Sequence, residues 1–280
     1  MSNPKVAIAH GRDPEPLVRR ALQLIEAAQV IAPGARVVLK PNYVEPRAPE
    51  TGVTTDPRVI ETVVVWLQEL GVQDITLAEG GDTAAKTDRA FRMVGLPELA
   101  ARRGVRLLNV FQDERVEVSI PGATSLPRVG LARTILEADC LINLPKLKCH
   151  SMAYVTLGIK NLMGAVVPDK TIMHHELDQR LADLALVLRP WLCVIDGLVG
   201  SESHETAGAP VETGVIIAGR DPVATDAVGA LVMGIEPQEV EHLRLCAQRG
   251  LGELRPKHIA VVGAPLAEVR KPYRRPWGWR

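Results

Sequence analysis

Short apolar runs alternate with longer amphipathic segments along most of this sequence, and this alternation restricts the fold more than any other feature. The run at residues 5–10 is followed by a segment at 15–31 whose apolar residues have helical spacing. A second run, residues 35–40, is followed by another helical segment at 56–71, with Asp56 as its expected N-cap. Runs that are apolar throughout are typical of parallel strands covered by helices on both faces. The sequence therefore predicts a three-layer, Rossmann-like α/β fold with a mostly parallel sheet.

Later segments continue this pattern, with one exception. Further strands are expected at residues 74–79, 105–110, 139–144, 192–197, 214–219 and 258–263. Residues 112–130 alternate polar and apolar side chains and contain two prolines and two glycines, so we expect a β-hairpin excursion there. Residues 1–270 are expected to form a single α/β domain or two closely packed lobes.

Composition excludes several classes of protein. Lys+Arg and Asp+Glu both number 33 and aromatic residues make up 3%, which is not typical of a nucleic-acid binder. The four cysteines form no C-x-x-C pair, which predicts that they are free buried thiols. This spacing is not typical of an iron-sulfur cluster or a zinc site. The N-terminal residues lack a secretory signal, and the apolar segment 181–199 contains charges and a proline. We expect a cytoplasmic protein that binds neither nucleic acid nor a membrane.

The last ten residues, 271–280, form a basic tail that contains two of the four tryptophans. Exposed tryptophan is unfavourable, because a large apolar ring then contacts water. The tail is expected to be a disordered end or, preferably, an arm that docks on a neighbouring subunit of a homo-oligomer.

Polar side chains follow the expected carboxyl ends of several strands, where open parallel sheets bind ligands. This group comprises Lys40, Asn42, Glu79, Lys146, Lys148, His150 and Asp196. The chain has only nine lysines against 24 arginines, so lysine is not its ordinary surface cation. A compact ammonium suits a point contact to a carboxylate or phosphate, and an amine with a depressed pKa suits covalent chemistry. One such lysine is as readily a solvated turn residue, but several together favour a site.

Lys160 lies in a segment, residues 151–168, that is otherwise almost entirely apolar and predicts a helix against the sheet. Desolvation there would lower the pKa of its amine, unless the side chain reaches water. Residues 169–188 predict a further helix that begins near His174 and His175. Adjacent helical residues point about 100° apart, so one histidine is expected to face the site as acid, base or metal ligand. A surface position explains the pair equally well.

Several motifs together resemble a known family. The segments LKPNYV, GVTTDPRVIETVV, LAEGG, ADCLINLPKLKCH, LGIKNLMGAV, VIDGLVGSE and AGRDPVATDAVGA look like the signature of the domain of unknown function 362 family, from Lys5 to Gly263. That family is similar to the N-terminal domain of nickel-pincer lactate racemases, in which a histidine stands ten residues before a lysine that holds a pyridinium-derived cofactor. The resemblance implies that His150 and Lys160 occupy these positions.

The resemblance also implies limits on the site. It places His174 or His175 near the nickel-binding histidine of the racemases, whereas the second catalytic histidine corresponds to residues 79–81 (EGG) here. A racemase with two catalytic histidines is therefore not implied. Some family members carry ferredoxin-like cysteine motifs, which this chain lacks, so an iron-sulfur cluster is not implied either.

We therefore expect an enzyme that acts on a small anionic substrate, a carboxylate or a phosphate, by isomerase- or racemase-like or redox chemistry. The expected catalytic residues are His150, Lys160, Glu79 and His174. The expected substrate-binding residues are Lys40, Asn42, Thr54, Thr55, Lys146, Lys148 and Asn161. His175, Asp196 and Asp226 are candidate metal ligands. The cofactor would be a divalent metal or an organic group linked to Lys160. The alternative is a non-catalytic binder or carrier that passes an anionic metabolite or cofactor to a partner.

Overall fold

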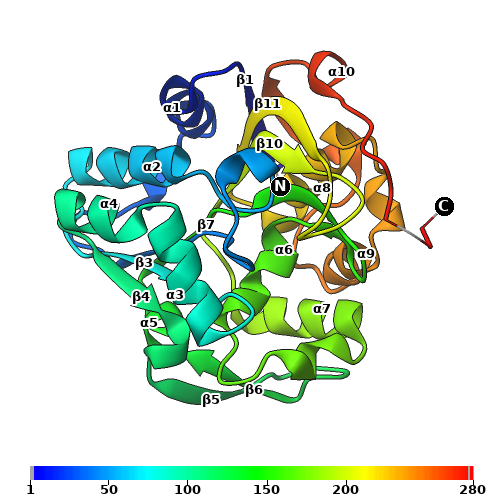
Figure 1. Ribbon diagram of the computed structural model, residues 1–280. Helices are drawn as coiled ribbons and strands as arrows, with labels where there is room; N and C mark the ends of the chain where they lie inside the picture. Colours follow the sequence, from blue (N-terminus) through cyan, green and yellow to red (C-terminus); the bar gives the residue numbers. More distant parts are fainter. Residues whose placement is uncertain (1–2, 277, 280) are drawn as a thin grey trace.

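A single large sheet organises the computed structural model, which describes residues 3–276 and 278–279 (Figure 1). Within these residues the sheet has ten strands. They are β1 (Lys5–His10), β2 (Val37–Lys40), β3 (Ile75–Glu79), β4 (Arg106–Asn109), β7 (Cys140–Asn143), β8 (Lys146–His150), β9 (Tyr154–Thr156), β10 (Leu192–Ser201), β11 (Pro210–Gly219) and β12 (Ala260–Gly263).

The order of the main path is β12-β1-β11-β10-β7-β2-β3-β4. Along the stretch β10-β7-β2-β3-β4, every neighbouring pair of strands is parallel. Strand β11 runs antiparallel to both β1 and β10. Strand β8 branches from β10 and pairs with β9. The sheet is therefore mixed but mostly parallel, and the predicted α/β class is confirmed.

Helices cover both faces of the sheet (Figure 1). They are α1 (Pro14–Leu24), α2 (Pro57–Glu69), α3 (Ala84–Met93), α4 (Leu96–Arg103), α5 (Arg133–Leu136), α6 (Gly158–Asn161), α7 (Leu177–Val187), α8 (Pro222–Val232), α9 (Glu241–Gln248) and α10 (Leu266–Val269). Alternate side chains of β1 enter different cores: Val6 and Ile8 pack with α7, α8 and α9, whereas Ala7 and Ala9 pack with α1, α2 and α4. This arrangement gives the predicted three layers.

Several local predictions are confirmed. The hairpin consists of β5 (Arg115–Ser119) and β6 (Arg128–Ala132), which form a separate antiparallel pair. Asp56 caps α2 by accepting a hydrogen bond from the Arg58 amide. The four cysteines, Cys140, Cys149, Cys193 and Cys246, are free and buried.

One predicted helix is wrong, and another begins later than predicted. Residues 151–168 form a turn, strand β9, the single-turn helix α6 and a 3-10 turn at Leu162–Ala165. The chain reverses after β8 because the His150 side chain accepts hydrogen bonds from the Met152 and Ala153 amides, which sets the turn that returns β9 onto β8. The next helix, α7, begins only at Leu177, because Glu176 has a left-handed backbone with φ 50. His174 ends a 3-10 turn instead, and His175 follows it.

The described part of the tail lies against its own chain rather than extending from it as an arm. Tyr273 is buried and its hydroxyl is 2.6 Å from the Thr213 hydroxyl. Trp279 stacks on Tyr154 with ring centroids 4.6 Å apart and donates to the Ser151 carbonyl. The other tail tryptophan, Trp277, lies outside the described residues. Oligomerisation through the tail stays a prediction.

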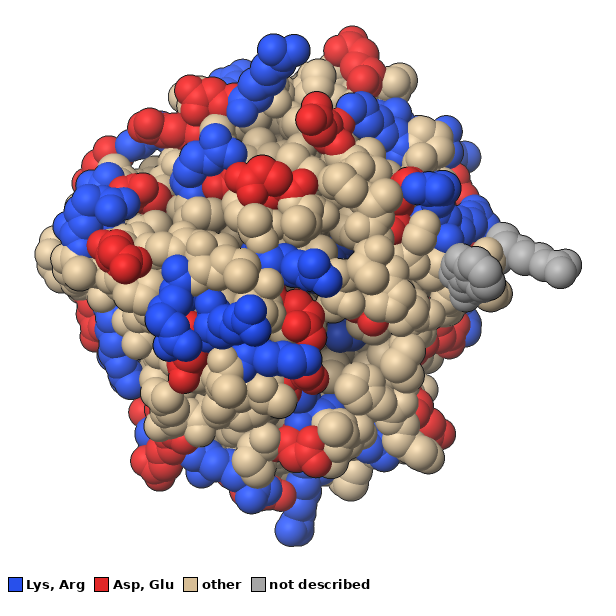
Figure 2. Space-filling model, in the orientation of Figure 1, with Lys and Arg blue, Asp and Glu red and all other residues tan. Residues whose placement is uncertain are grey.

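The surface carries charges of both signs, in keeping with the equal numbers of acidic and basic residues in the sequence. On the face in Figure 2, acidic and basic side chains are mixed, with the largest gathering of basic side chains over and beside α3. Among the described helices, none is both long and apolar enough to cross a membrane.

Candidate functional site

A cavity of about 290 Å³ lies beyond the carboxyl ends of β2, β3 and β8. Its walls come from the loop after β3, from the segment around α6, and from residues 168–171. His150, Lys160, Glu79, Asn42, Asn161 and His174 all line it, as the strand-end argument predicts. A larger depression of about 950 Å³ lies beside Lys5 and Trp191, near the opposite end of β10, and contains none of the predicted site residues.

A buried ion pair closes the floor of this cavity. The Lys40 ammonium is 2.6 Å from a Glu79 carboxylate oxygen, and both side chains are almost fully buried. Burial lowers the pKa of Lys40 and raises that of Glu79, while each charge attracts the other. The pair fits only because Gly164 lacks a side chain, since a Cβ there would lie 2.4 Å from the Lys40 nitrogen. Lys40 therefore acts through Glu79 rather than as a free anion ligand.

Lys160 lies on α6, and the residue is only 9% exposed. Its nitrogen contacts the Met163 sulfur at 3.4 Å, and no described oxygen accepts a hydrogen bond from it. Burial is the main cause that lowers the pKa of this amine to about 8. A substantial fraction of Lys160 is therefore neutral near physiological pH, as general-base or nucleophilic chemistry requires.

His150 is held in one tautomer. Its Nδ1 accepts hydrogen bonds from the Met152 amide at 3.1 Å and the Ala153 amide at 3.2 Å. Because Nδ1 is the acceptor, the ring proton lies on Nε2. Burial and the nearby charges of Lys160 and Lys148 lower the pKa of the ring, which keeps it neutral. His150 is thus a neutral hydrogen-bond donor on the cavity wall.

Two further wall residues, Lys170 and Glu205, were not selected from the sequence. Lys170 donates to the Gly80 carbonyl and its nitrogen lies 5.1 Å from the centroid of the Phe111 ring. Burial lowers the pKa of Lys170 to about 7. Glu205 accepts from the Ser151 amide at 2.9 Å and from its hydroxyl at 3.0 Å. The rarity of lysine in this chain was a signal for Lys170, but neither it nor Glu205 follows a strand directly.

Two wall residues carry buried polar atoms that lack a partner among the described residues. These atoms are the Thr156 hydroxyl and the Asn42 side-chain oxygen. The Asn42 amide nitrogen is occupied, since it donates to Asn161 at 2.7 Å. Buried polar groups are normally hydrogen-bonded, because desolvation otherwise costs free energy. Both atoms are therefore left without a hydrogen-bond partner by the described residues.

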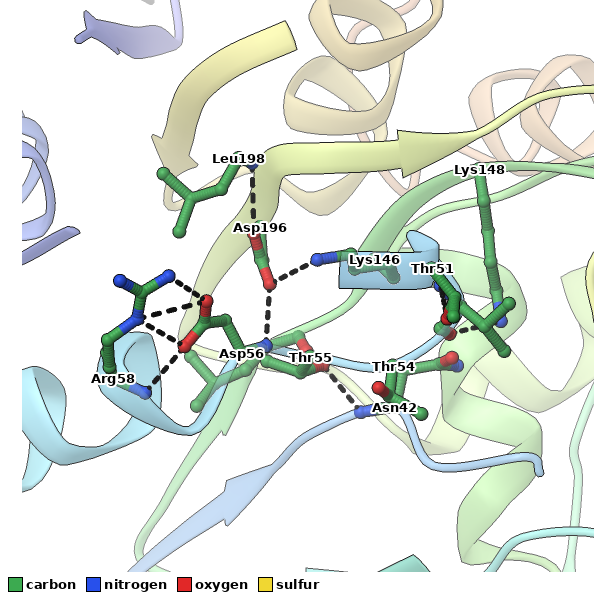
Figure 3. Close-up of polar contacts among 12 residues, drawn as sticks. Asn42, Thr51, Thr54, Thr55, Asp56, Arg58, Lys146, Lys148, Asp196 and Leu198 are labelled. Carbon is green, nitrogen blue, oxygen red and sulfur yellow. Dashed lines mark hydrogen bonds and ion pairs between the residues drawn. The ribbon is translucent and has the colours of Figure 1, made fainter. Parts of the chain in front are cut away.

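Other predicted substrate ligands are saturated by the chain itself (Figure 3). Lys146 pairs with Asp196 at 2.7 Å, and the same Asp196 oxygen accepts from the Asp56 amide at 2.7 Å. Lys148 donates to the Val53 carbonyl at 2.8 Å.

The hydroxyls of Thr54 and Thr55 are occupied in the same way, by the carbonyls of Arg47 and Leu144. None of these four residues, Lys146, Lys148, Thr54 and Thr55, lines the cavity. Their contacts fix the loop after β2 against β8 and β10, so their predicted role in contacting substrate is corrected to one of support.

The candidate metal ligands do not come together. His175 is exposed beside Glu176, whereas Asp196 pairs with Lys146. Asp226 is buried on α8 and accepts hydrogen bonds from the Gly158 and Ile159 amides, so it anchors the start of α6. Across residues 3–276 and 278–279, no group of three or more His, Cys, Asp or Glu residues is arranged to hold a metal ion. The donor set therefore does not fit a metal centre.

Comparisons with known proteins place this geometry in a family context. Residues 37–231 match the family described as "Domain of unknown function (DUF362)". A thylakoid-associated protein of Synechocystis sp. is 28% identical over 261 residues, which cover 86% of this chain and 75% of that protein. Given the name of this relative, the cytoplasmic location stays a prediction.

Two solved structures also match, each at 12% identity. A protein from Thermotoga maritima has a TM-score of 0.45 and the match covers 85% of this chain and 60% of that one. The lactate racemase apoprotein from Thermoanaerobacterium thermosaccharolyticum has a TM-score of 0.42, with 88% and 57% covered. This chain thus spans less than two thirds of the length of either structure.

Proposed function

Because the chain belongs to the DUF362 family, whose name assigns no reaction, we propose its activity from the residues that line the cavity. The proposed activity is that of an enzyme that moves a proton on a small substrate with a carboxylate or phosphate group, as isomerases and racemases do. The observation that carries the proposal is the Lys160 amine, which lines the cavity without an oxygen acceptor. An amine in that state can take a proton from carbon or attack a carbonyl carbon.

Substrate binding would use two groups of the cavity wall. The Lys170 ammonium and the unpartnered Thr156 hydroxyl both lie on its wall and suit an anionic oxygen. Glu79 is less suited to act as a base, since Lys40 holds its carboxylate at 2.6 Å. Its role is to keep the floor of the cavity in place and to compensate the charge of Lys40.

His150 would stabilise the charge that develops on the substrate. Removal of a proton next to a carboxylate or carbonyl group places negative charge on an oxygen atom. The N–H of a neutral imidazole can donate a hydrogen bond to that oxygen and so stabilise its charge. The two backbone amides on Nδ1 fix the ring so that Nε2–H is the available donor.

Hydrogen exchange tests this proposal. The purified protein is incubated in D₂O with a panel of small 2-hydroxy, 2-amino and 2-oxo acids, and loss of C–H signal adjacent to the carbonyl or carboxylate carbon is followed by NMR. We expect exchange with at least one acid, reduced by roughly 10²-fold or more in Lys160→Met and in His150→Gln. Lys257→Met, on the exposed surface, is the matched control and should behave as the unmodified chain.

Calorimetric titration of the same acids separates an enzyme from a carrier. Tight binding without exchange, unchanged by Lys160→Met, would favour the binder or carrier over the enzyme. Neither binding nor exchange with any acid would contradict the proposed substrate class.

A further inference from the structure

The buried lysines of this chain are not equivalent. Four of them donate to an oxygen atom: Lys40 to Glu79, Lys146 to Asp196, Lys148 to Val53 and Lys170 to Gly80. Lys160 differs, because its only described partner is the thioether sulfur of Met163 at 3.4 Å. A thioether is a weak acceptor and does not compensate an ammonium that has left water. Lys160 is therefore the one of these five lysines whose nitrogen donates to no oxygen atom among the described residues.

The position of Lys160 suits attack on a bound carbonyl group. Its nitrogen belongs to a cavity wall that also carries the unpartnered Thr156 hydroxyl and the N–H of His150. These groups can donate to the oxygen of a carbonyl as it gains negative charge. The Lys170 ammonium on the same wall can hold an adjacent carboxylate, and a cavity of about 290 Å³ limits the ligand to a small one.

We propose that Lys160 forms a Schiff base with a small 2-oxo acid bound in this cavity. This inference rests on the proposed function, because it uses the same site and names the substrate class. The Lys160 nitrogen attacks the carbonyl carbon, and the C–N bond forms as the C=O π bond breaks. The nitrogen then loses two protons overall, the oxygen gains two and leaves as water, and no other reactant is consumed.

The imine also accounts for the proton transfer proposed above. Protonation of its nitrogen by solvent gives a cation, which withdraws electrons from the neighbouring C–H bond of the bound acid. That bond becomes acidic, and the Glu205 carboxylate, which lies on the same wall and is held by Ser151, would receive the proton. Burial of Lys160, which is 9% exposed, restricts the water that would hydrolyse the imine.

Reductive trapping tests the inference. The full chain is incubated with pyruvate or glyoxylate and sodium cyanoborohydride, which transfers hydride to an imine carbon and leaves a stable secondary amine. We expect one adduct per chain by intact mass and its location on Lys160 by peptide mapping. Lys160→Arg and Lys160→Met should abolish it, and Lys257→Met should not. Lys170→Met should keep the site of modification but raise the half-saturating pyruvate concentration by roughly tenfold or more.

A competition arm distinguishes failure of this inference from failure of the proposed function. Lactate has the carboxylate of pyruvate but no carbonyl, so it should slow trapping without forming an adduct. If lactate binds and pyruvate exchanges hydrogen, yet no adduct forms at Lys160, the Schiff base is wrong and the proton-transfer site stands. An adduct spread over exposed lysines, or one that persists in correctly folded Lys160→Met, also overturns the inference. If no acid binds at all, both proposals fail.

Discussion

A pH series distinguishes Lys160 from an ordinary exposed lysine. Burial lowers the pKa of Lys160 to about 8, whereas an exposed lysine titrates near about 10.4. Only the neutral amine reacts with acylating reagents, so modification of Lys160 should rise with pH, reach half its maximum near pH 8 and then level off. Modification of a model lysine peptide added to the same reaction should continue to rise for about two further pH units. Peptide mapping across a pH series measures both, and equal midpoints would contradict the buried, uncompensated amine.

Lys160 and Lys146 should affect stability in opposite directions. The unfolded chain protonates Lys160 more readily than the folded chain does between pH 8 and about 10.4, so the folded state is penalised at neutral pH. Lys160→Met should therefore raise the free energy of unfolding, by about 1–3 kcal/mol. Lys146→Met should lower it by about 3–5 kcal/mol, because Asp196 would be left buried and unpaired. Urea denaturation at pH 7 measures both, and a loss in Lys160→Met would count against its role as an uncompensated site residue.

The contrast between Lys160 and Lys146 also marks where sequence reasoning ends. Both lysines lie in or directly after apolar runs; the sequence predicts Lys146 as a substrate ligand and Lys160 as a catalytic residue. The partner of Lys146 is Asp196, fifty residues away, and that of Lys148 is the Val53 carbonyl, 95 residues away. Whether a lysine at a strand end donates a hydrogen bond to another residue of the chain depends on which loops fold over that strand end. Residue type and position predicted the location of the site but not which lysines remain available.

At the scale of elements, sequence patterns predicted the parallel strands better than the segment that carries the site. A buried parallel strand is recognisable because it is apolar on both faces. Residues 151–168 are apolar for a different reason, since their turn, short strand and short helical turns pack into one of the two hydrophobic cores, the one that contains α7, α8 and α9. Hydrophobicity alone does not separate these cases. The turn depends instead on the His150 side chain, which satisfies two backbone amides.

Gly164 connects this segment to the floor of the cavity. A Cβ at position 164 would lie 2.4 Å from the Lys40 nitrogen and 2.6 Å from a Glu79 oxygen. Gly164→Ala should therefore push the buried ion pair apart and destabilise the fold by about 3 kcal/mol or more, through strain and lost charge compensation. Gly11→Ala is the matched control, since its added methyl meets only the end of the Leu17 side chain, at 3.2 Å. Thermal unfolding of both variants tests this, and equal stabilities would show that the floor can rearrange.

At the scale of the whole molecule, the tail closes the fold beside the site. Trp279 stacks on Tyr154 and donates to the Ser151 carbonyl, and Ser151 is in turn held by Glu205 of the cavity wall. In the sequence, this segment combines basic residues with two tryptophans, and the cost of exposing tryptophan favoured an arm that docks on a neighbouring subunit. Its aromatic rings determine the observed placement, because burying them against the chain removes more apolar surface from water than leaving them exposed.

Two truncations separate the contributions of the tail. Removing residues 271–280 deletes Tyr273, which is buried and bonded to Thr213, and should lower the free energy of unfolding by about 3–5 kcal/mol. Removing only residues 277–280 keeps Tyr273 and deletes the stacked Trp279, so the loss should be about 0.5–1.5 kcal/mol for the ring pair. The shorter deletion should nevertheless weaken binding of pyruvate or lactate, since the turn that fixes His150 and Glu205 loses its support. Chemical denaturation, light scattering and titration of the two proteins distinguish the cases. A change in oligomeric mass with unchanged monomer stability would instead restore the arm as a contact between subunits.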